Sequence, residues 1–328
     1  MPTKGETLSA LLASGRIANL PTVWSNVLVA FWLSSSLTPL HQSSDYDDGT
    51  RLLALLITIL AASMIYVGGC LLGDAVDAEF DQKHRPQRPI PSGILSAVYV
   101  KLVALLLLAV ALIGWFFGHQ LWAQEIQPHL MILVCLLIAL VSCYAFYHKK
   151  NKPAALLMMA SCRFMLIMLA IGAAHQVLPA EHSVKTAPLT HYFDWVQAWM
   201  ILLASSVGLY TLLLSWVAST ESSPGAFKSR SILAALLLSV PLITIPCRPM
   251  LSATTYTGHV VALLIIYLWL CYALVTLKRS KPGFVSRALA GFCLLDACFL
   301  ALLDPVLAMI PLLLFVLALA MQRYTPAT

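Results

Sequence analysis

Residues 52–93 read LLALLITILAASMIYVGGCLLGDAVDAEFDQKHRPQRPIPSG, an uncharged apolar run that ends in the most densely charged segment of the chain. A transmembrane helix needs about 20 mostly apolar residues to cross a hydrocarbon core roughly 30 Å thick. Residues 52–73 meet that requirement, so we expect them to form a membrane-spanning helix. The charged residues that follow then lie where this helix leaves the membrane. The stretch predicts both a fold class and a place for a polar site.

The composition of the whole chain also indicates a membrane protein. Hydrophobic residues make up 60% of the 328 positions and charged residues only 10%. A soluble domain of this size could not cover its surface with so little charge. The formal net charge is +6, but the charges cluster in short loops between apolar runs, which argues against nucleic-acid binding. The cysteines form no CxxC pair, so we expect neither a disulfide framework nor a zinc site.

Further crossings follow from the same length rule. The expected spans are residues 17–37, 52–73, 94–117, 128–147, 153–177, 195–218, 231–249, 258–277 and 287–321. The last run is too long for one straight crossing. Asp304-Pro305 interrupts it, and proline kinks or breaks a helix, so one kinked helix and two shorter elements both remain open. We expect an all-α, polytopic bundle of about nine transmembrane helices that forms a single domain over residues 1–328.

Lysine and arginine are distributed unevenly among the predicted loops. Most of the 20 basic residues lie in the N-terminal segment and in the loops after the second, fourth, sixth and eighth spans. Short cytoplasmic loops of membrane proteins carry an excess of these residues. We therefore predict an integral inner-membrane (plasma-membrane) protein whose N-terminus and polar-site loops face the cytoplasm.

Three aspartates in the charged segment are spaced for one face of a helix. Asp74, Asp77 and Asp81 follow an i, i+3, i+7 pattern, which at about 100° per residue predicts a narrow acidic face. Converging carboxylates repel one another unless a cation neutralises them, and oxygen-only ligands suit Mg²⁺ shared with phosphate oxygens. The alternative is a solvated loop whose mixed charges only set topology. Basic residues that could hold the remaining phosphate charge follow at Lys83, Arg85 and Arg88.

These residues resemble the first aspartate-rich motif of the UbiA superfamily of intramembrane prenyltransferases. That motif reads Asn-Asp-x-x-Asp-x-x-x-Asp and precedes a basic segment ending in Arg-Pro-x-Pro-Ser-Gly. Asp74, Asp77 and Asp81 match the acidic positions, residues 88–93 match the tail, and Gly73 stands where the family has asparagine. The resemblance implies nine transmembrane helices with acidic motifs after the second and sixth.

Other parts of the chain match this family less closely. Residues 144–150, YAFYHKK, look like the family's Tyr-x-x-Tyr-x-Lys-Arg segment, and Asn26 lies where the first helix carries a polar pocket residue. The loop after the sixth span departs from the pattern. Residues 212–231 read LLLSWVASTESSPGAFKSRS, in which Glu221 is the only acid and the second Asp-x-x-x-Asp motif is missing. This departure suits a divergent member, such as the UbiA-like protein of bacterial ebo-type gene clusters.

The resemblance implies a Mg²⁺-dependent prenyltransferase that moves an isoprenyl group from its diphosphate to an aromatic, other small or lipid acceptor. Asp74, Asp77 and Asp81 would bind the metal, and these three with Glu221 would be the catalytic residues. Residues expected to bind substrate are Asn26, Lys83, Arg85, Arg88, Tyr147, Lys149, Lys150 and Arg163. Because the second motif is missing, a noncatalytic protein that binds or transports a lipid or metabolite remains the alternative.

Two charged residues are predicted to lie deep in the membrane. Arg163 and Asp296 fall near the middle of apolar spans, where exposure to lipid costs several kcal/mol. Arg163 would either extend the cationic field around the diphosphate or form a buried ion pair with Asp296 or Asp304. The histidines, such as His84, His119 and His148, show no ligand spacing, so we expect them to be surface or interfacial residues.

Overall fold

The computed structural model describes residues 3–37, 48–121, 128–176, 190–219, 236–250, 253–277 and 281–325. Within these ranges, eight helices are long and apolar enough to cross a membrane. They are α2 (Leu20–Leu37), α3 (Asp48–Val76), α5 (Ala97–Gln120), α6 (Pro128–Tyr147), α7 (Lys152–Gln176), α8 (Thr190–Ser219), α10 (Ala253–Leu277) and α11 (Lys281–Ala301). The shorter elements are α1 (Lys4–Ser14), η1 (Ile17–Asn19), α4 (Ala78–His84), η4 (Leu237–Met250) and α12 (Met309–Tyr324). The predicted all-α membrane bundle is confirmed.

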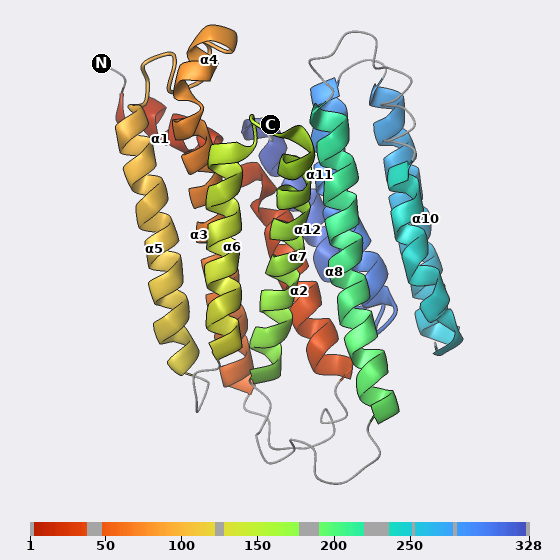
Figure 1. Cartoon of the computed structure of the whole chain (residues 1–328). Helices are drawn as coiled ribbons and strands as arrows, with labels where there is room; N and C mark the ends of the chain where they lie inside the picture. Colours follow the sequence, from red (N-terminus) through yellow and green to blue (C-terminus); the bar gives the residue numbers. More distant parts are fainter. Residues whose placement is uncertain are drawn as a thin grey trace.

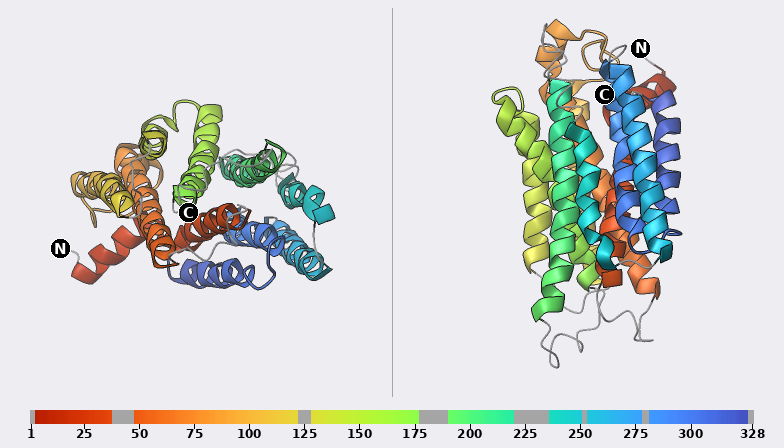
Figure 2. Two further views of the ribbon diagram at one scale, coloured as in Figure 1. Left: turned by 90° about the horizontal axis from the view of Figure 1, so that it is seen from below. Right: turned by 90° about the vertical axis from the view of Figure 1, so that its right-hand side faces the viewer.

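The long helices run side by side, and α2 and α11 form the centre of the bundle (Figures 1 and 2). About four fifths of each central span is buried inside the protein, namely 78% for Ile17–Ser34 and 83% for Gly283–Ala301, whereas the figure for the spans on α5 and α6 is 22%. Helix α2 contacts α3, α7, α8, α11 and α12. A polar residue on α2 can therefore reach groups on several other helices.

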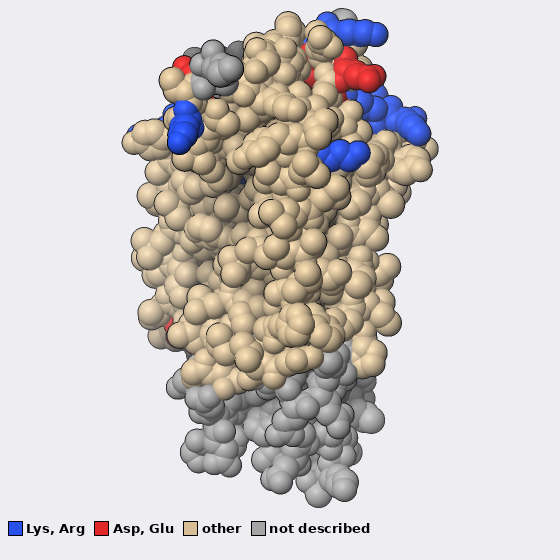
Figure 3. Space-filling model, turned by 90° about the vertical axis from the view of Figure 1, so that its left-hand side faces the viewer, with Lys and Arg blue, Asp and Glu red and all other residues tan. Residues whose placement is uncertain are grey.

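The outer surface of the bundle is apolar along its length. Large hydrophobic side chains on α5, such as Val98, Leu102 and Leu106, are more than 60% exposed. In Figure 3 the flank of the molecule is almost free of charged residues, which gather at the end where α4 lies. We call this the polar end. Because only a lipid environment suits such a flank, the chain is an integral membrane protein.

Two predicted spans differ from a simple crossing. The expected span 231–249 is described from residue 236, and it forms the 3₁₀ helix η4. Its sequence, LLSVPLITIPCRPM, holds three prolines, each of which lacks the N–H group that an α-helix needs. The run 287–321 is two elements, α11 and α12, as one of the two alternatives predicted.

The break between α11 and α12 is built around Asp304-Pro305. The Val306 backbone N–H donates to Asp304 Oδ1 at 2.7 Å, which satisfies a group that the interrupted helix leaves free. Helix α10 packs closely here, because a Cβ added at Gly258 would lie 2.6 Å from Pro305 Cγ. Glycine at 258 is therefore required for the approach of α10 to this break.

Candidate functional site

The polar end of α3 carries the predicted acidic motif, but the motif does not lie on one continuous helix. Helix α3 ends at Val76, and Asp77 is the N-cap residue of α4, which begins at Ala78. The expectation that all three aspartates share one helical face is therefore wrong. Asp81 on α4 is only 2% exposed, and Arg88 lies directly against its carboxylate.

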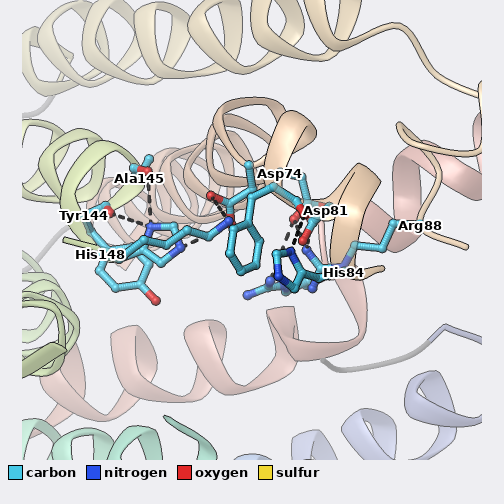
Figure 4. A network of polar contacts seen from close by, with 11 residues as sticks. Asp74, Asp81, His84, Arg88, Tyr144, Ala145 and His148 are labelled. Atoms are coloured by element: carbon cyan, nitrogen blue, oxygen red, sulfur yellow. Dashed lines mark hydrogen bonds and ion pairs between the residues drawn. The ribbon is translucent and has the colours of Figure 1, made fainter. Parts of the chain in front are cut away.

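Asp74 and Asp81 converge on one guanidinium group (Figure 4). Arg88 Nη1 lies 2.7 Å from Asp81 Oδ2 and 3.5 Å from Asp74 Oδ1. Arg88 is held by the turn that follows α4, in which the N–H groups of Ser92 and Gly93 donate back to the carbonyls of residues 88 and 90. Gly93 has φ +81°, a left-handed conformation that suits glycine. The turn thus brings Arg88 into direct contact with Asp74 and Asp81.

Arg16 is a site residue that sequence reasoning missed. Its Nη2 lies 3.9 Å from Asp74 Oδ1. Arg16 joins α1 to η1 and has φ 48°, which is a strained backbone conformation for a residue other than glycine. Only its basic character and its place before the first span could have suggested this role.

Asp77 points away from the other two aspartates, toward the end of α6. Lys149 Nζ lies 2.7 Å from Asp77 Oδ1, and His148 Nε2 lies 3.2 Å from Asp77 Oδ2. Burial opposes the ionisation of Asp77, but the hydrogen bonds from His148 and Lys149 outweigh it and lower the pKa of this carboxyl. Lys149 Nζ also lies 3.6 Å from the centre of the Phe80 ring, which fixes the ammonium group against α4.

His148 is the second residue that the sequence did not reveal. Its Nδ1 faces the carbonyl oxygens of Tyr144 and Ala145 at 3.1 and 3.2 Å, while Nε2 faces Asp77 (Figure 4). Both ring nitrogens meet acceptors, so both can donate only when the imidazole is protonated. The hydrogen bond with Asp77 accordingly raises the pKa of His148 despite partial burial. Its position between Tyr147 and Lys149 in the YAFYHKK segment was the available signal.

The predicted basic and aromatic residues divide into two groups. Arg88 and Lys149 contact the aspartates, as described above. Lys83 and Arg85 are exposed, and neither forms an ion pair with a residue that the structure describes. Tyr147 is 51% exposed and its ring lies beside Lys150, whose Nζ is 4.8 Å from the ring centre. Glu221 lies outside the described residues.

The carboxylates at the polar end could supply only part of the ligand set of a Mg²⁺ ion. No group of three or more His, Cys, Asp or Glu side chains within the described ranges could enclose a metal ion. However, Asp74 and Asp81 already share one cationic atom, Arg88 Nη1. Mg²⁺ is commonly held by one or two carboxylates together with substrate phosphates. The donor set therefore suits a metal that is shared with a phosphorylated ligand rather than enclosed by protein.

A second polar cluster lies among the central helices. Arg163 Nη1 on α7 donates to Asn26 Oδ1 on α2 at 2.6 Å, and Asn26 Nδ2 donates to Asp296 Oδ2 on α11 at 2.8 Å. No ion pair joins Arg163 to Asp296 or Asp304 within the described residues, because the Asn26 amide stands between Arg163 and Asp296. Asn26 and Arg163 are thus brought together, at a place away from the three aspartates.

Comparisons with known proteins agree with this architecture. A search of curated protein sequences found no match. The fold is similar to a solved structure from a study of digeranylgeranylglyceryl phosphate synthase in membranes, with a TM-score of 0.55 and 18% identity over 93% of this chain and 99% of that one. At that identity the similarity shows the fold alone. The sequence model of the UbiA prenyltransferase family matches residues 18–288. Since this match covers more than half of the chain, the protein belongs to the UbiA prenyltransferase family.

Proposed function

We propose that the chain is an intramembrane prenyltransferase that moves an isoprenyl group from its diphosphate to an acceptor. The observation that carries this proposal is the convergence of Asp74 and Asp81 on one cationic position at the polar end of α3. Family membership supports the reaction class. The distribution of lysine and arginine supports an orientation in which this end faces the cytoplasm.

In the proposed reaction, the bond between the allylic carbon and the diphosphate oxygen breaks, and the electron pair leaves with the diphosphate. The allylic carbon then bonds to the acceptor, which loses a proton. Mg²⁺ held by Asp74 and Asp81 would stabilise the negative charge that develops on the leaving group. Glu221 is the residue that we propose as the proton acceptor.

Arg88 has two successive partners in this proposal. Its guanidinium forms ion pairs with Asp74 and Asp81. With Mg²⁺ and the diphosphate bound, Arg88 would pair with phosphate oxygens in place of the carboxylates, because a planar guanidinium can donate two parallel hydrogen bonds to them. Arg16, whose Nη2 is 3.9 Å from Asp74, supplies positive charge on the side toward the bundle.

Asp77 has a positioning part in the same site. By binding Lys149 and His148 it connects the α3–α4 break to the end of α6. The break determines where Asp74 and Asp81 lie relative to each other. A reaction chamber enclosed by the helices would limit the access of water, which would protect an allylic cation from hydrolysis.

The experiment uses purified protein in lipid nanodiscs with Mg²⁺, a labelled allylic diphosphate and a panel of aromatic acceptors. We expect Mg²⁺-dependent diphosphate release that falls about a hundredfold in Asp81→Asn. Glu79→Gln is the matched control, because Glu79 is an exposed acid on the same short helix. Retained activity in Asp81→Asn would contradict the proposal.

The second candidate is a noncatalytic membrane protein that binds or transports a lipid or metabolite. It is favoured by the single acid, Glu221, in the loop where the family pattern has a second acidic motif. Tight diphosphate binding without product, across the whole acceptor panel, would support this candidate over the enzyme.

A further inference from the structure

Arg287 on α11 carries a charge that no acidic residue balances within the described part of the chain. The ion pairs among the described residues do not include it. Its Nη1 donates to the Gly283 carbonyl at 3.0 Å, one turn earlier on the same helix. Between positions 253 and 325 the only acids are Asp296, nine residues further along α11, and Asp304 at the α11–α12 break. Nine residues correspond to about 14 Å along a helix, so neither acid reaches Arg287.

Arg287 lies near the level of the lipid headgroups. Helix α10 ends at Leu277 and α11 begins at Lys281, and these neighbouring ends lie at the polar end of the bundle (Figure 1). Arg287 comes six residues after the start of α11, which corresponds to about 9 Å. The headgroup layer adds roughly 5–8 Å to each side of the hydrocarbon core. The guanidinium therefore lies close to the boundary between that layer and the core, where a long arginine side chain can reach the headgroups.

Helix α10 forms one wall beside Arg287. The Arg287 Cζ atom lies 5.1 Å from the centre of the Tyr272 ring. Trp269 Nε1, one turn deeper on α10, donates to the Arg287 carbonyl at 2.9 Å. Tyr272 is 50% exposed, and its hydroxyl forms no hydrogen bond with any residue that the structure describes. Tyr272 thus holds the guanidinium by a cation–π contact and leaves a further donor beside it.

Helix α12 forms the other wall. Gln322 Nε2 donates to the Ser286 carbonyl at 3.0 Å, which places Gln322 next to Arg287 along α11. About two turns deeper on α12, the Phe315 ring packs edge-to-face on Trp269, with 4.7 Å between the ring centres. These contacts fasten α10 and α12 to α11 around the arginine. We call Trp269, Tyr272, Arg287 and Gln322 the Arg287 niche.

The donors of the niche suit a phosphate group. A guanidinium has five N–H donors, of which Arg287 uses one within the described residues. A planar guanidinium can donate two parallel hydrogen bonds to phosphate oxygens, and the Tyr272 hydroxyl can add a third. Arg323, the exposed residue after Gln322, supplies a second positive charge on the neighbouring helix.

The charge of the niche indicates which lipid it selects. The phosphate group of a phospholipid lies at this level of the bilayer. In a zwitterionic headgroup a cation accompanies the phosphate, and the niche offers that cation no carboxylate among its described residues. A headgroup with a net negative charge meets only the positive charges of Arg287 and Arg323, which attract it.

We propose that the Arg287 niche binds the phosphate group of a phospholipid with net negative charge, taken from the leaflet at the polar end. Arg287 and Tyr272 donate to the phosphate oxygens, and the acyl chains lie along the apolar outer faces of α10 and α12. The niche does not depend on the proposed prenyl transfer.

The test is native mass spectrometry of the full chain, released from micelles that contain equal amounts of phosphatidylglycerol and phosphatidylcholine with identical acyl chains. We expect the wild-type protein to carry severalfold more phosphatidylglycerol. Arg287→Gln should lower the ratio of phosphatidylglycerol to phosphatidylcholine about five- to tenfold. Arg287→Lys, which keeps the charge but loses the planar group, should lower it less. Equal amounts of the two lipids on the wild-type protein would overturn the proposal.

Two further variants separate the niche from a general effect of charge. Tyr272→Phe keeps the ring and loses only the exposed hydroxyl, so it should lower the ratio about twofold without changing the unfolding temperature. Lys101→Gln removes an exposed positive charge near the start of α5, on another flank, and should leave the ratio unchanged. A loss in Lys101→Gln as large as that in Arg287→Gln would refute a specific niche.

The remaining comparisons distinguish a lipid from free phosphate and from the ligand of the proposed function. An excess of inorganic phosphate should not displace phosphatidylglycerol, because the acyl chains contribute to its binding; full displacement would show an anion site and not a lipid site. Asp81→Asn should carry phosphatidylglycerol as the wild-type protein does, and Arg287→Gln should bind Mg²⁺-pyrophosphate normally. Loss of phosphatidylglycerol in Asp81→Asn would overturn the independence of the niche from the acidic motif.

Discussion

Lys149 Nζ lies 2.7 Å from Asp77 Oδ1, so the end of α6 is bound to the break between α3 and α4. Asp77 lies in the sequence between the two aspartates that share Arg88. The contact therefore relates two parts of the polar end that are far apart in the sequence.

Replacing Lys149 with methionine should affect ligand binding more than stability. The Lys149 side chain is 34% exposed, and pairs of that kind contribute less than about 1 kcal/mol to stability. Affinity for Mg²⁺-pyrophosphate should fall about tenfold, because the break no longer holds its geometry and one positive charge is lost. Calorimetry and thermal unfolding check both effects. Lys152→Met, an exposed neighbour, is the control and should change neither.

Arg88→Gln should have opposite effects on two ligands. Without pyrophosphate, the affinity for Mn²⁺, measured by electron paramagnetic resonance, should rise severalfold because the competing guanidinium is gone. With pyrophosphate, affinity should fall about tenfold because one phosphate partner is missing. Lys101→Gln on α5 serves as the control. Weaker Mn²⁺ binding in Arg88→Gln under both conditions would refute the exchange of partners.

The pair of Asp77 and His148 should make stability depend on pH. The pKa of His148 is raised above 6.5, so its contribution is fully present below pH 6.5 and disappears as pH rises through the folded-state pKa. The pKa of Asp77 is lowered below 3.8, so its contribution is present above pH 3.8 and disappears as pH falls through the folded-state pKa. The difference in unfolding temperature between wild type and His148→Gln, without metal, should therefore be large near pH 5 and small near pH 9. A difference that does not vary with pH would exclude this pairing.

Gly258→Ala should destabilise the bundle by about 1–3 kcal/mol, because the added methyl group would overlap the rigid ring of Pro305. Gly114→Ala on α5 is the matched control. A Cβ at position 114 would have no neighbour within 4 Å, so this change should be neutral or slightly stabilising. Thermal unfolding in a single detergent compares the two variants.

The orientation of the chain can be tested with reporter fusions. A fusion after Lys152 should report a cytoplasmic location, because that turn belongs to the set of loops rich in lysine and arginine. A fusion after Thr50 should report the opposite side. A periplasmic signal from the Lys152 fusion would reverse the proposed orientation.

The crossings were predictable because each depends mainly on local composition and length, as residues 128–147 show. The sequence also showed the proline at Asp304-Pro305, and one of the two alternatives based on it, two separate helices, is correct. The 3₁₀ form of η4 was not predicted, because a rule based on the length of an apolar run ignores the N–H groups that its three prolines lack.

The site was harder to predict, because its geometry depends on contacts between distant segments. The spacing of Asp74 and Asp81 indicated convergence, but the direction of Asp77 depends on cations that α6 supplies. The depth of Arg163 and Asp296 was readable from hydropathy. Their connection through Asn26 was not, because periodicity does not reveal which helices are neighbours.

The salt bridges of Arg88 also bear on the lipid around the protein. Bare carboxylates next to anionic phospholipid headgroups would repel the bilayer surface. With its guanidinium between Asp74 and Asp81, Arg88 acts as a built-in counter-ion, so this end of the protein is compatible with acidic lipids.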